Sequence, residues 1–182
     1  PNLCLADYVR PLSMCVTDRA GAFASTVDAA MEHDFRGDDY TRMLAQTLAD
    51  RLAEATTERM HEEVRRTYWG YAPHEQLTKE QLFREEFQGI RPAVGYPSLP
   101  DTSVNFLLDS LLDMKSIGIR LTESGAMQPH ASVTGFMFAH PQARYFDLGK
   151  IGSDQFLDYA RRRGVPVELM RRFLASSLAP QT

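Results

Sequence analysis

A long helical repeat near the middle of the chain restricts the folds open to it. The apolar residues that recur at the spacing of one helix face are Leu44, Leu48, Leu52, Ala55, Met60 and Val64. Because this spacing continues from about Asp39 to Tyr68, it predicts one amphipathic helix of many turns. Gly70 and Pro73 then act as stop signals.

Shorter elements flank this helix. Further helices are predicted at about 79–88, 102–118, 153–164 and 166–178, and strands at 21–27, 119–124, 132–140 and 143–149. Thr78 and Gln81 have capping-box spacing at the start of the first of these helices. Because three of the strands follow helices without alternating with them, we expect an antiparallel sheet and an α+β fold, not βαβ winding.

The composition narrows the class of protein. A chain of 182 residues with 43% hydrophobic and 24% charged residues has the make-up of one globular domain, so we expect a single domain over 1–182. A formal charge of -4 argues against nucleic acid as a partner. No apolar run approaches the length of a bilayer-spanning helix, so no membrane partner is expected. Cys4 and Cys15, without a CxxC motif, fit a reducing compartment, and we expect the cytoplasm.

The segment "GIRPAVGYPSLPD", residues 89–101, is unusually stiff. Each residue that precedes one of its prolines is biased to extended backbone, and Gly95 frees one position for a positive φ. The stiffness would hold the guanidinium of Arg91 and the ring of Tyr96 in place for a ligand that carries a carboxylate, a cation or a flat base. The simpler alternative on these residues alone is a structural connection with Arg91 in a salt bridge.

The long helix carries a column of acids. Asp50, Glu54, Glu58 and Glu62 follow one another at steps of four residues and so share one face. Because neighbouring like charges on a helix are unfavourable, we expect a basic group to face this column. One of the carboxylates could then turn toward a cationic ligand group. The alternative is a solvated polar face.

Other motifs are few. Tyr145 and Phe146 are adjacent in a predicted strand and should point to opposite faces, one toward the core and one free for stacking, although both could simply be packing residues. The five histidines show no HxxxH spacing, so no metal site is expected. The GxxxxGK[ST], GxGxxG and GxSxG motifs are absent, which argues against a self-contained kinase, Rossmann enzyme or hydrolase.

Several segments occur in an order that is itself informative. They are "CLADYVRP", "MLAQTLADRLAEA", "HEEVRRTYWGYAP", "GIRPAVGYPSLPD", "RLTESGAM", "ASVTGFMFAHP", "ARYF" and "DQFLDYARRRG". With the RxxxGYP motif that begins at Arg91, this order resembles the S-adenosylmethionine-binding activation domain of cobalamin-dependent methionine synthase. The resemblance covers nearly the whole chain. It implies a curved, mostly antiparallel sheet with long helices packed against it.

The resemblance also implies a ligand site. The positions that it carries over are Arg91, Ala93, Gly95, Tyr96, Glu54, Glu85, Tyr145 and Phe146. It implies that Arg91 binds the methionyl carboxylate and that the backbone around Ala93 and Gly95, with Tyr96, frames the ligand. The two glutamates are family carboxylates near the ligand, and the last two residues are its aromatic pair. No catalytic residue and no metal ligand is implied.

In the family, such a domain presents the methyl group of S-adenosylmethionine to inactive cob(II)alamin while a flavodoxin-type donor supplies an electron. The cobalamin is bound by a partner domain or protein. This chain has no DxHxxG motif, which supplies the histidine ligand to cobalt, so it is expected to be part of a methyltransferase and not a complete enzyme.

The chain also departs from the family pattern within this domain, and the first departure leaves an alternative open. The family domain begins upstream of position 1 with a segment whose aspartate contacts the ligand's amino group. Val94 and Gln128 replace a common proline and tryptophan. The alternative is a truncated interaction module that docks on a separate corrinoid protein without useful ligand binding.

Overall fold

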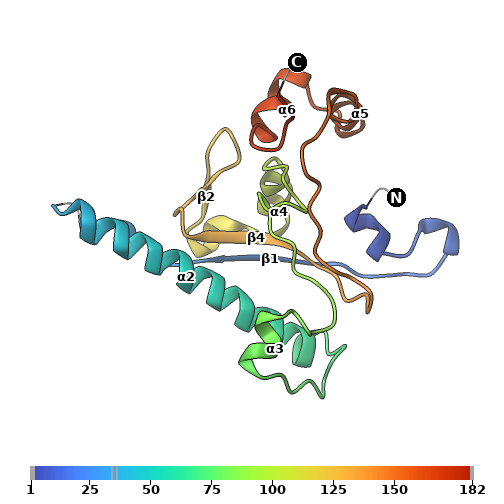
Figure 1. Cartoon of the computed structure of the whole chain (residues 1–182), viewed down its shortest axis with the longest axis horizontal. Coiled ribbons are helices and arrows are strands. Elements are labelled where there is room, and N and C mark those ends of the chain that lie inside the picture. Colours follow the sequence, from blue (N-terminus) through green and yellow to red (C-terminus); the bar gives the residue numbers. More distant parts are fainter. Residues whose placement is uncertain (1–2, 34, 36, 181–182) are drawn as a thin grey trace.

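The computed structural model describes residues 3–33, 35 and 37–180. In chain order its elements are η1 (Leu5–Tyr8), η2 (Leu12–Met14), β1 (Gly21–Thr26), α1 (Ala30–His33), α2 (Asp39–Glu63), η3 (Val64–Tyr68), α3 (Lys79–Phe83), α4 (Val104–Leu112), η4 (Met114–Ile117), β2 (Arg120–Leu121), β3 (Met127–Gln128), β4 (Ser132–Met137), α5 (Ser153–Arg163) and α6 (Val167–Phe173). The η elements are short 3-10 helices, except that η3 is a π-helical turn continuing α2. In Figure 1, α2 crosses beside β1 and β4, with α3 near its C-terminal end and α5 and α6 at the other side of the molecule.

The strands form small antiparallel sheets. β1 pairs with β4 in a register that begins with Gly21 opposite Met137. β2 and β3 form a separate antiparallel pair, with Arg120 opposite Gln128. The predicted α+β fold with antiparallel strands and long helices is therefore confirmed.

The stiff loop adds a third, irregular strand to the β1–β4 sheet. Residues 90–94 run antiparallel to β4 on the edge away from β1: the Ile90 N–H donates to the Phe138 carbonyl at 2.9 Å, and the reverse bond is 3.0 Å. Gly135 permits this close approach, because a Cβ there would lie 2.1 Å from the Pro92 carbonyl oxygen. The absence of a side chain at position 135 therefore allows residues 90–94 to pair with β4.

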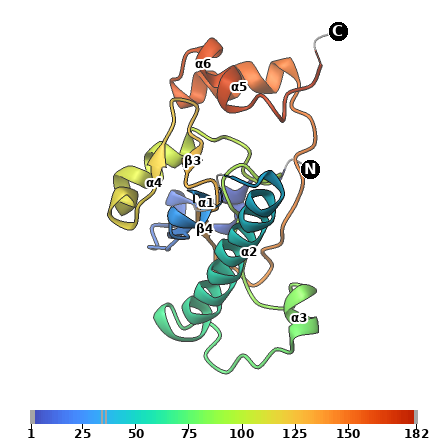
Figure 2. The ribbon, with the colours of Figure 1, turned by 90° about the vertical axis from the view of Figure 1, so that its left-hand side faces the viewer.

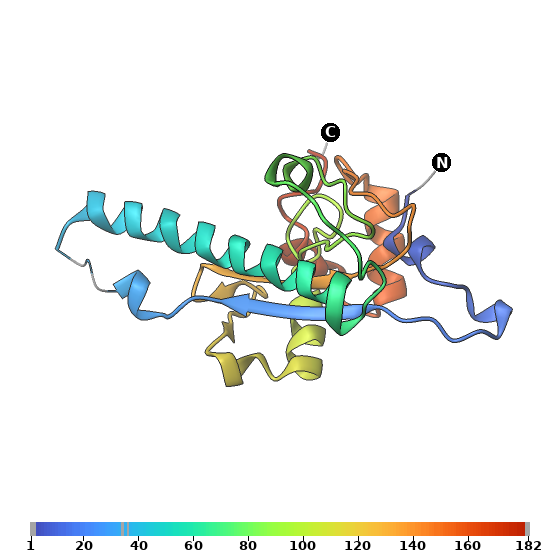
Figure 3. The ribbon, with the colours of Figure 1, turned by 90° about the horizontal axis from the view of Figure 1, so that it is seen from below.

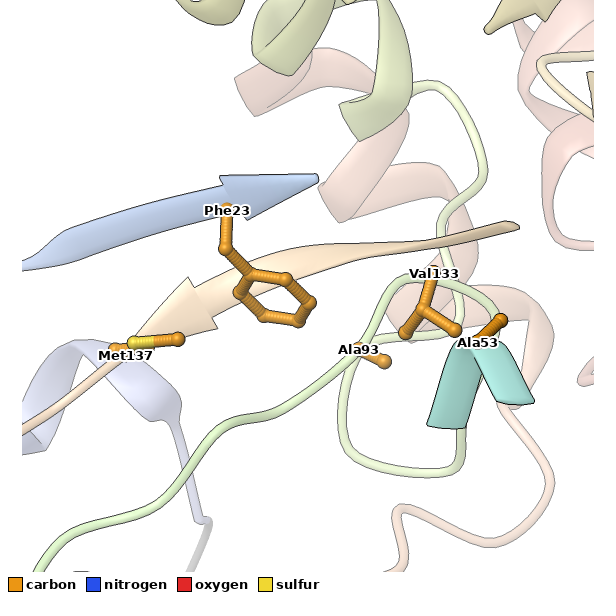
Figure 4. Packing of buried hydrophobic residues seen from close by; sticks show 5 residues of the cluster. All are labelled: Phe23, Ala53, Ala93, Val133 and Met137. Atoms are coloured by element: carbon orange, nitrogen blue, oxygen red, sulfur yellow. The ribbon is translucent and has the colours of Figure 1, made fainter. Parts of the chain in front are cut away.

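The buried side chains form three clusters. The first lies between the sheet and α2 and contains Phe23, Ala53, Ala93, Val133 and Met137 (Figure 4). The second lies against α4 and contains Val94, Val104, Leu108, Met114 and Ile119. The third joins α5 to α6 and contains Phe156, Ala160, Met170, Phe173 and Leu174. Figure 2 shows α2 and α4 on opposite faces of the sheet, so residues 90–94 lie between two cores.

The buried face of α2 differs from the apolar repeat that predicted the helix. Its buried residues are Ala49, Ala53, Thr57 and His61. Leu44, Leu48 and Leu52 are 47%, 55% and 50% exposed. Small side chains let the helix backbone lie close to the sheet, whereas the N-terminal half of α2 extends past the end of β1 (Figure 3).

The helix before the stiff loop is shorter than expected. The capping box of α3 is confirmed, because Thr78 Oγ1 accepts from the Gln81 N–H and the Gln81 side chain accepts from the Thr78 N–H. However, α3 ends at Phe83, whereas the sequence predicts a helix to Gln88. Glu85 has a φ of 56°, in the left-handed region that interrupts a right-handed helix.

The other helix ends largely match their signals. Gly118, with a φ of 89°, follows η4 and ends the α4–η4 unit as predicted. Gly164, with a φ of 64°, ends α5 as predicted. The cap of α5 is Gly152 and not Ser153, which is the first helical residue.

The predicted strand at 143–149 is wrong. This segment has no strand partner among the residues that the structure describes. β4 cannot offer it an edge, because β1 occupies one edge and residues 90–94 occupy the other. Tyr145 and Phe146 consequently lie on an irregular segment, and both are half-buried.

None of the helices in the described ranges combines the length and apolarity that crossing a lipid bilayer requires.

Candidate functional site

The backbone of Arg91 is held on both sides. Residues 90–94 pair with β4, and the Arg91 N–H, which points the other way, donates to the Tyr145 hydroxyl at 2.9 Å. The residue is 7% exposed. The segment after β4 therefore returns to fix the loop, although it forms no strand.

The guanidinium of Arg91 reaches α2. Its Nη2 donates to Glu58 Oε1 in an ion pair. Its Nε is buried without a hydrogen-bond partner in the described part of the chain. The salt bridge that the sequence leaves open as an alternative is thus present, but it does not satisfy every donor of this buried cation.

Tyr96 makes the equivalent contact one helical turn away. Its hydroxyl donates to Glu54 Oε1. Burial and then the neighbouring Glu54 raise the pKa of Tyr96 to about 12. The two side chains singled out in the stiff loop, Arg91 and Tyr96, are therefore both joined to carboxylates of α2.

The turn between these side chains depends on Gly95. Its φ of 89° lies in the left-handed region, and its N–H donates to the Leu99 carbonyl at 2.8 Å. A Cβ on Gly95 would meet no atom within 4 Å, so the glycine serves the backbone conformation and not a close contact. Ala93 belongs to the core against α2, and its carbonyl accepts from the Tyr96 N–H at 3.3 Å.

Tyr145 joins this constellation from another segment, whereas Glu85 is exposed and makes no hydrogen bond to it within the described residues. Burial raises the pKa of the Tyr145 hydroxyl, while the hydrogen bond from the Arg91 N–H and the positive charge of Arg91 act in the opposite direction. Phe146 is half-buried beside Tyr145 in the chain. The expectation that this aromatic pair lies on a strand is wrong, so the strand alternation that predicted opposite faces does not apply to it.

The expectation that a basic group faces the acidic column of α2 is confirmed. Arg91 faces Glu58 from the loop, and Arg66 Nη1 donates to Glu62 at 2.8 Å from the same helix. Glu58 is the contact of Arg91 that motif reasoning missed. The signal for it was the four-residue spacing of the column, which did not say which acid meets the loop.

A buried polar network lies behind Arg91. Arg65 is fully buried and donates to Glu75 through Nε at 2.8 Å and Nη2 at 2.6 Å. Its guanidinium lies 4.5 Å from the centre of the Phe87 ring. Burial, followed by the positive charges of Arg65 and Arg91, lowers the pKa of His61 to about 3, so this imidazole is neutral near pH 7.

No group of three or more metal-ligating side chains occurs within residues 3–33, 35 and 37–180. Surface hollows of about 450 Å³ and 370 Å³ lie elsewhere, one around Arg10, Asp18 and His140 and one around Phe106 and Phe173. The arrangement of Arg91 and Tyr96 with Glu54 and Glu58 suits a small ligand that carries both an acidic group and cationic groups.

Comparisons with known proteins point to the same kind of module. Residues 1–164 match the family model described as the activation domain of vitamin B12-dependent methionine synthase. A solved structure described as the crystal structure of the MetH reactivation domain bound to AdoHcy is 46% identical in sequence and superposes with a TM-score of 0.87. The match covers 98% of this chain and 57% of that chain.

Proposed function

Because the chain belongs to the activation-domain family of vitamin B12-dependent methionine synthase, we propose that it binds S-adenosylmethionine and presents the activated methyl group to a cobalamin partner. The AdoHcy named for the similar structure is the product that remains when S-adenosylmethionine gives up its methyl group. The proposal treats residues 1–182 as one activation domain.

The observation that carries the proposal is the state of Arg91. Its guanidinium is almost fully buried, and its Nε has no hydrogen-bond partner in the described residues. A buried cation with an unused donor is unfavourable unless an acceptor completes it. The α-carboxylate of S-adenosylmethionine is an acceptor of suitable shape and charge for a planar guanidinium.

The other residues of the constellation fit the rest of the ligand. Tyr96, with the backbone at Ala93 and Gly95, would frame it, and Tyr145 with Phe146 would supply aromatic surface. These positions fit because Tyr96 is 49% exposed and Gly95 has open space above it. The carboxylates of Glu54 and Glu85 would favour a ligand with a sulfonium charge.

The chemistry at cobalt belongs to the partner. Cobalamin held by that partner would accept the methyl group of S-adenosylmethionine together with one electron from a flavodoxin-type donor, and S-adenosylhomocysteine would be released. The role of this chain is to bind the ligand, to orient its carboxylate end and to leave the methyl group facing the partner that carries cobalamin. Cobalamin is not proposed to bind to this chain alone.

Isothermal titration calorimetry with S-adenosylmethionine tests the proposal. Arg91→Ala should weaken binding by about 1.5 to 3 kcal/mol, roughly tenfold or more in Kd, because a charge-assisted hydrogen-bond pair is lost. Arg84→Ala is the matched control, since Arg84 is a solvent-exposed arginine that pairs with Glu86. Equal, measurable affinity of the wild type and Arg91→Ala would exclude the carboxylate role.

A second function is favoured by one observation. Arg91 and Tyr96 are already engaged by Glu58 and Glu54, which is the arrangement expected if the loop is only structural. The chain would then dock on a corrinoid protein without binding the ligand. In that case millimolar S-adenosylmethionine would not raise the unfolding temperature, while a cobalamin-binding protein would still be retained in a pull-down.

A further inference from the structure

We infer that Glu58 is the counter-charge for the ligand's α-ammonium group, so that the Arg91–Glu58 ion pair recognises the zwitterionic amino-acid end of S-adenosylmethionine as a unit. The inference rests on the proposed function and names a specificity-determining residue within that site. It concerns a contact additional to the upstream aspartate that the family resemblance implies.

The two partners of the ion pair are unequally buried. The Arg91 side chain is 8% exposed, whereas that of Glu58 is 50% exposed. A ligand that arrives from solvent therefore meets the carboxylate first and the guanidinium behind it. The only hydrogen bond of the Glu58 side chain within the described residues is the one to Arg91, so one carboxylate oxygen is available to a ligand.

An α-amino acid carries opposite charges on one carbon atom. Its carboxylate can pair with Arg91, which has an unsatisfied Nε, while its ammonium group pairs with the free edge of Glu58. One ion pair is then replaced by two, and no buried charge is left without a partner. A ligand with the carboxylate alone would separate Glu58 from Arg91 and leave the acid without a new cation.

The neighbouring acids of the column are not equivalent to Glu58. Glu54 accepts the Tyr96 hydroxyl, whereas Glu62 accepts hydrogen bonds from Arg59 and Arg66 on its own helix. Glu58 alone among the three contacts the residue proposed to bind the ligand carboxylate. Its position on α2, and not merely its charge, gives it this role.

The test measures binding of three ligands to wild type, Glu58→Gln and the control Glu62→Gln by calorimetry. The ligands are S-adenosylhomocysteine, its analogue that lacks the α-amino group, and 5′-methylthioadenosine, which lacks the whole amino-acid end. Glu58→Gln should weaken S-adenosylhomocysteine by roughly tenfold, the value of one charged hydrogen bond. It should not weaken the analogue that lacks the α-amino group, because that ligand gains nothing from the Glu58 charge, and it should leave 5′-methylthioadenosine unchanged. Glu62→Gln should bind all three as the wild type does.

Three results would overturn the inference. Tighter binding of both carboxylate ligands to Glu58→Gln would show that Glu58 merely competes for Arg91. Equal weakening of both would show that Glu58 only orients Arg91. If wild type binds none of the ligands at millimolar concentration, the proposed function fails, and the inference with it. Glu58→Asp, which keeps the charge, and thermal unfolding of every variant distinguish a lost contact from a lost fold.

Discussion

The buried Arg65–Glu75 ion pair behind the loop should be a strong determinant of stability. Arg65 is fully buried, the Glu75 side chain is 8% exposed, and three short nitrogen–oxygen contacts join them. Glu75→Gln keeps the shape of the side chain but removes the charge that compensates Arg65. Removing one partner of a buried ion pair typically lowers the free energy of unfolding by about 3 to 5 kcal/mol, because the remaining charge is buried without a counter-charge.

This free energy corresponds to a large shift in unfolding temperature. For a chain of this length, each kcal/mol lowers the midpoint by about 2 to 4 °C, so Glu75→Gln should lower it by roughly 6 to 20 °C. Differential scanning calorimetry is the assay. Glu86→Gln is the matched control, because it removes the same charge from a solvent-exposed pair with Arg84 and should leave the midpoint unchanged.

A double substitution separates the charge from the packing. Arg65→Met with Glu75→Leu removes both charges and keeps an apolar contact with the Phe87 ring. Most of the lost stability should return, because no uncompensated charge remains. A midpoint for Glu75→Gln within about 2 °C of the wild type, less than the effect of 1 kcal/mol, would refute the reasoning.

Three further predictions concern His61 and two glycines. Burial and two nearby arginines lower the pKa of His61 to about 3, so between this value and about 6.5 the unfolded chain binds a proton that the folded chain excludes. The free energy of unfolding should therefore fall as pH drops from about 6.5 toward 3, by up to about 1.4 kcal/mol per pH unit. The unfolding free energy, measured by urea unfolding at several pH values in this range, should change less steeply with pH for His61→Gln than for the wild type. The same pH dependence in both proteins would contradict the prediction. Gly135→Ala should lower the free energy of unfolding by about 1 to 3 kcal/mol and detach residues 90–94 from β4, because its Cβ would lie 2.1 Å from the Pro92 oxygen. An unchanged rate of amide hydrogen exchange at Ile90 would contradict the detachment. Gly95→Ala should lower the free energy of unfolding by about 1 to 2 kcal/mol because of its positive φ alone, without any steric contact. If denaturant unfolding instead gives the wild-type stability, the turn can relax and the prediction is wrong.

Gly37→Ala is the control for both glycine substitutions. Among the described residues, a Cβ at Gly37 would meet no atom within 4 Å, and Gly37 is not one of the glycines with a positive φ. The control should therefore unfold as the wild type does. Comparison with Gly135→Ala isolates steric overlap, and comparison with Gly95→Ala isolates backbone strain.

Local sequence patterns account for the secondary-structure elements that were predicted correctly. The 3.6-residue period revealed α2, the Thr78–Gln81 spacing revealed the start of α3, and Gly118 and Gly164 marked helix ends. Each of these signals acts within a few residues through hydrogen bonds or backbone dihedral angles. The ordered segments also identified the family, and the family match confirms that identification.

The misassigned strand at 143–149 has a non-local cause. Its residues have ordinary strand propensity, but a strand also needs a free sheet edge. Both edges of β4 are occupied, one of them by a proline-rich segment that no strand pattern would select. The predicted site residue Tyr145 nevertheless reaches Arg91, because an irregular segment can still bring one hydroxyl to one backbone N–H.

The amino-acid pattern was sufficient to place Arg91 and Tyr96 in a stiff loop and four acids on one face of a long helix. Only the tertiary structure decided that Arg91 meets Glu58, 33 residues earlier in the chain, and that Tyr96 meets Glu54. The physical reason is the range of the interactions involved. Helix period and proline restriction are properties of neighbouring residues, whereas these two contacts depend on the pairing of residues 90–94 with β4 and on the small residues that let α2 lie close to the sheet.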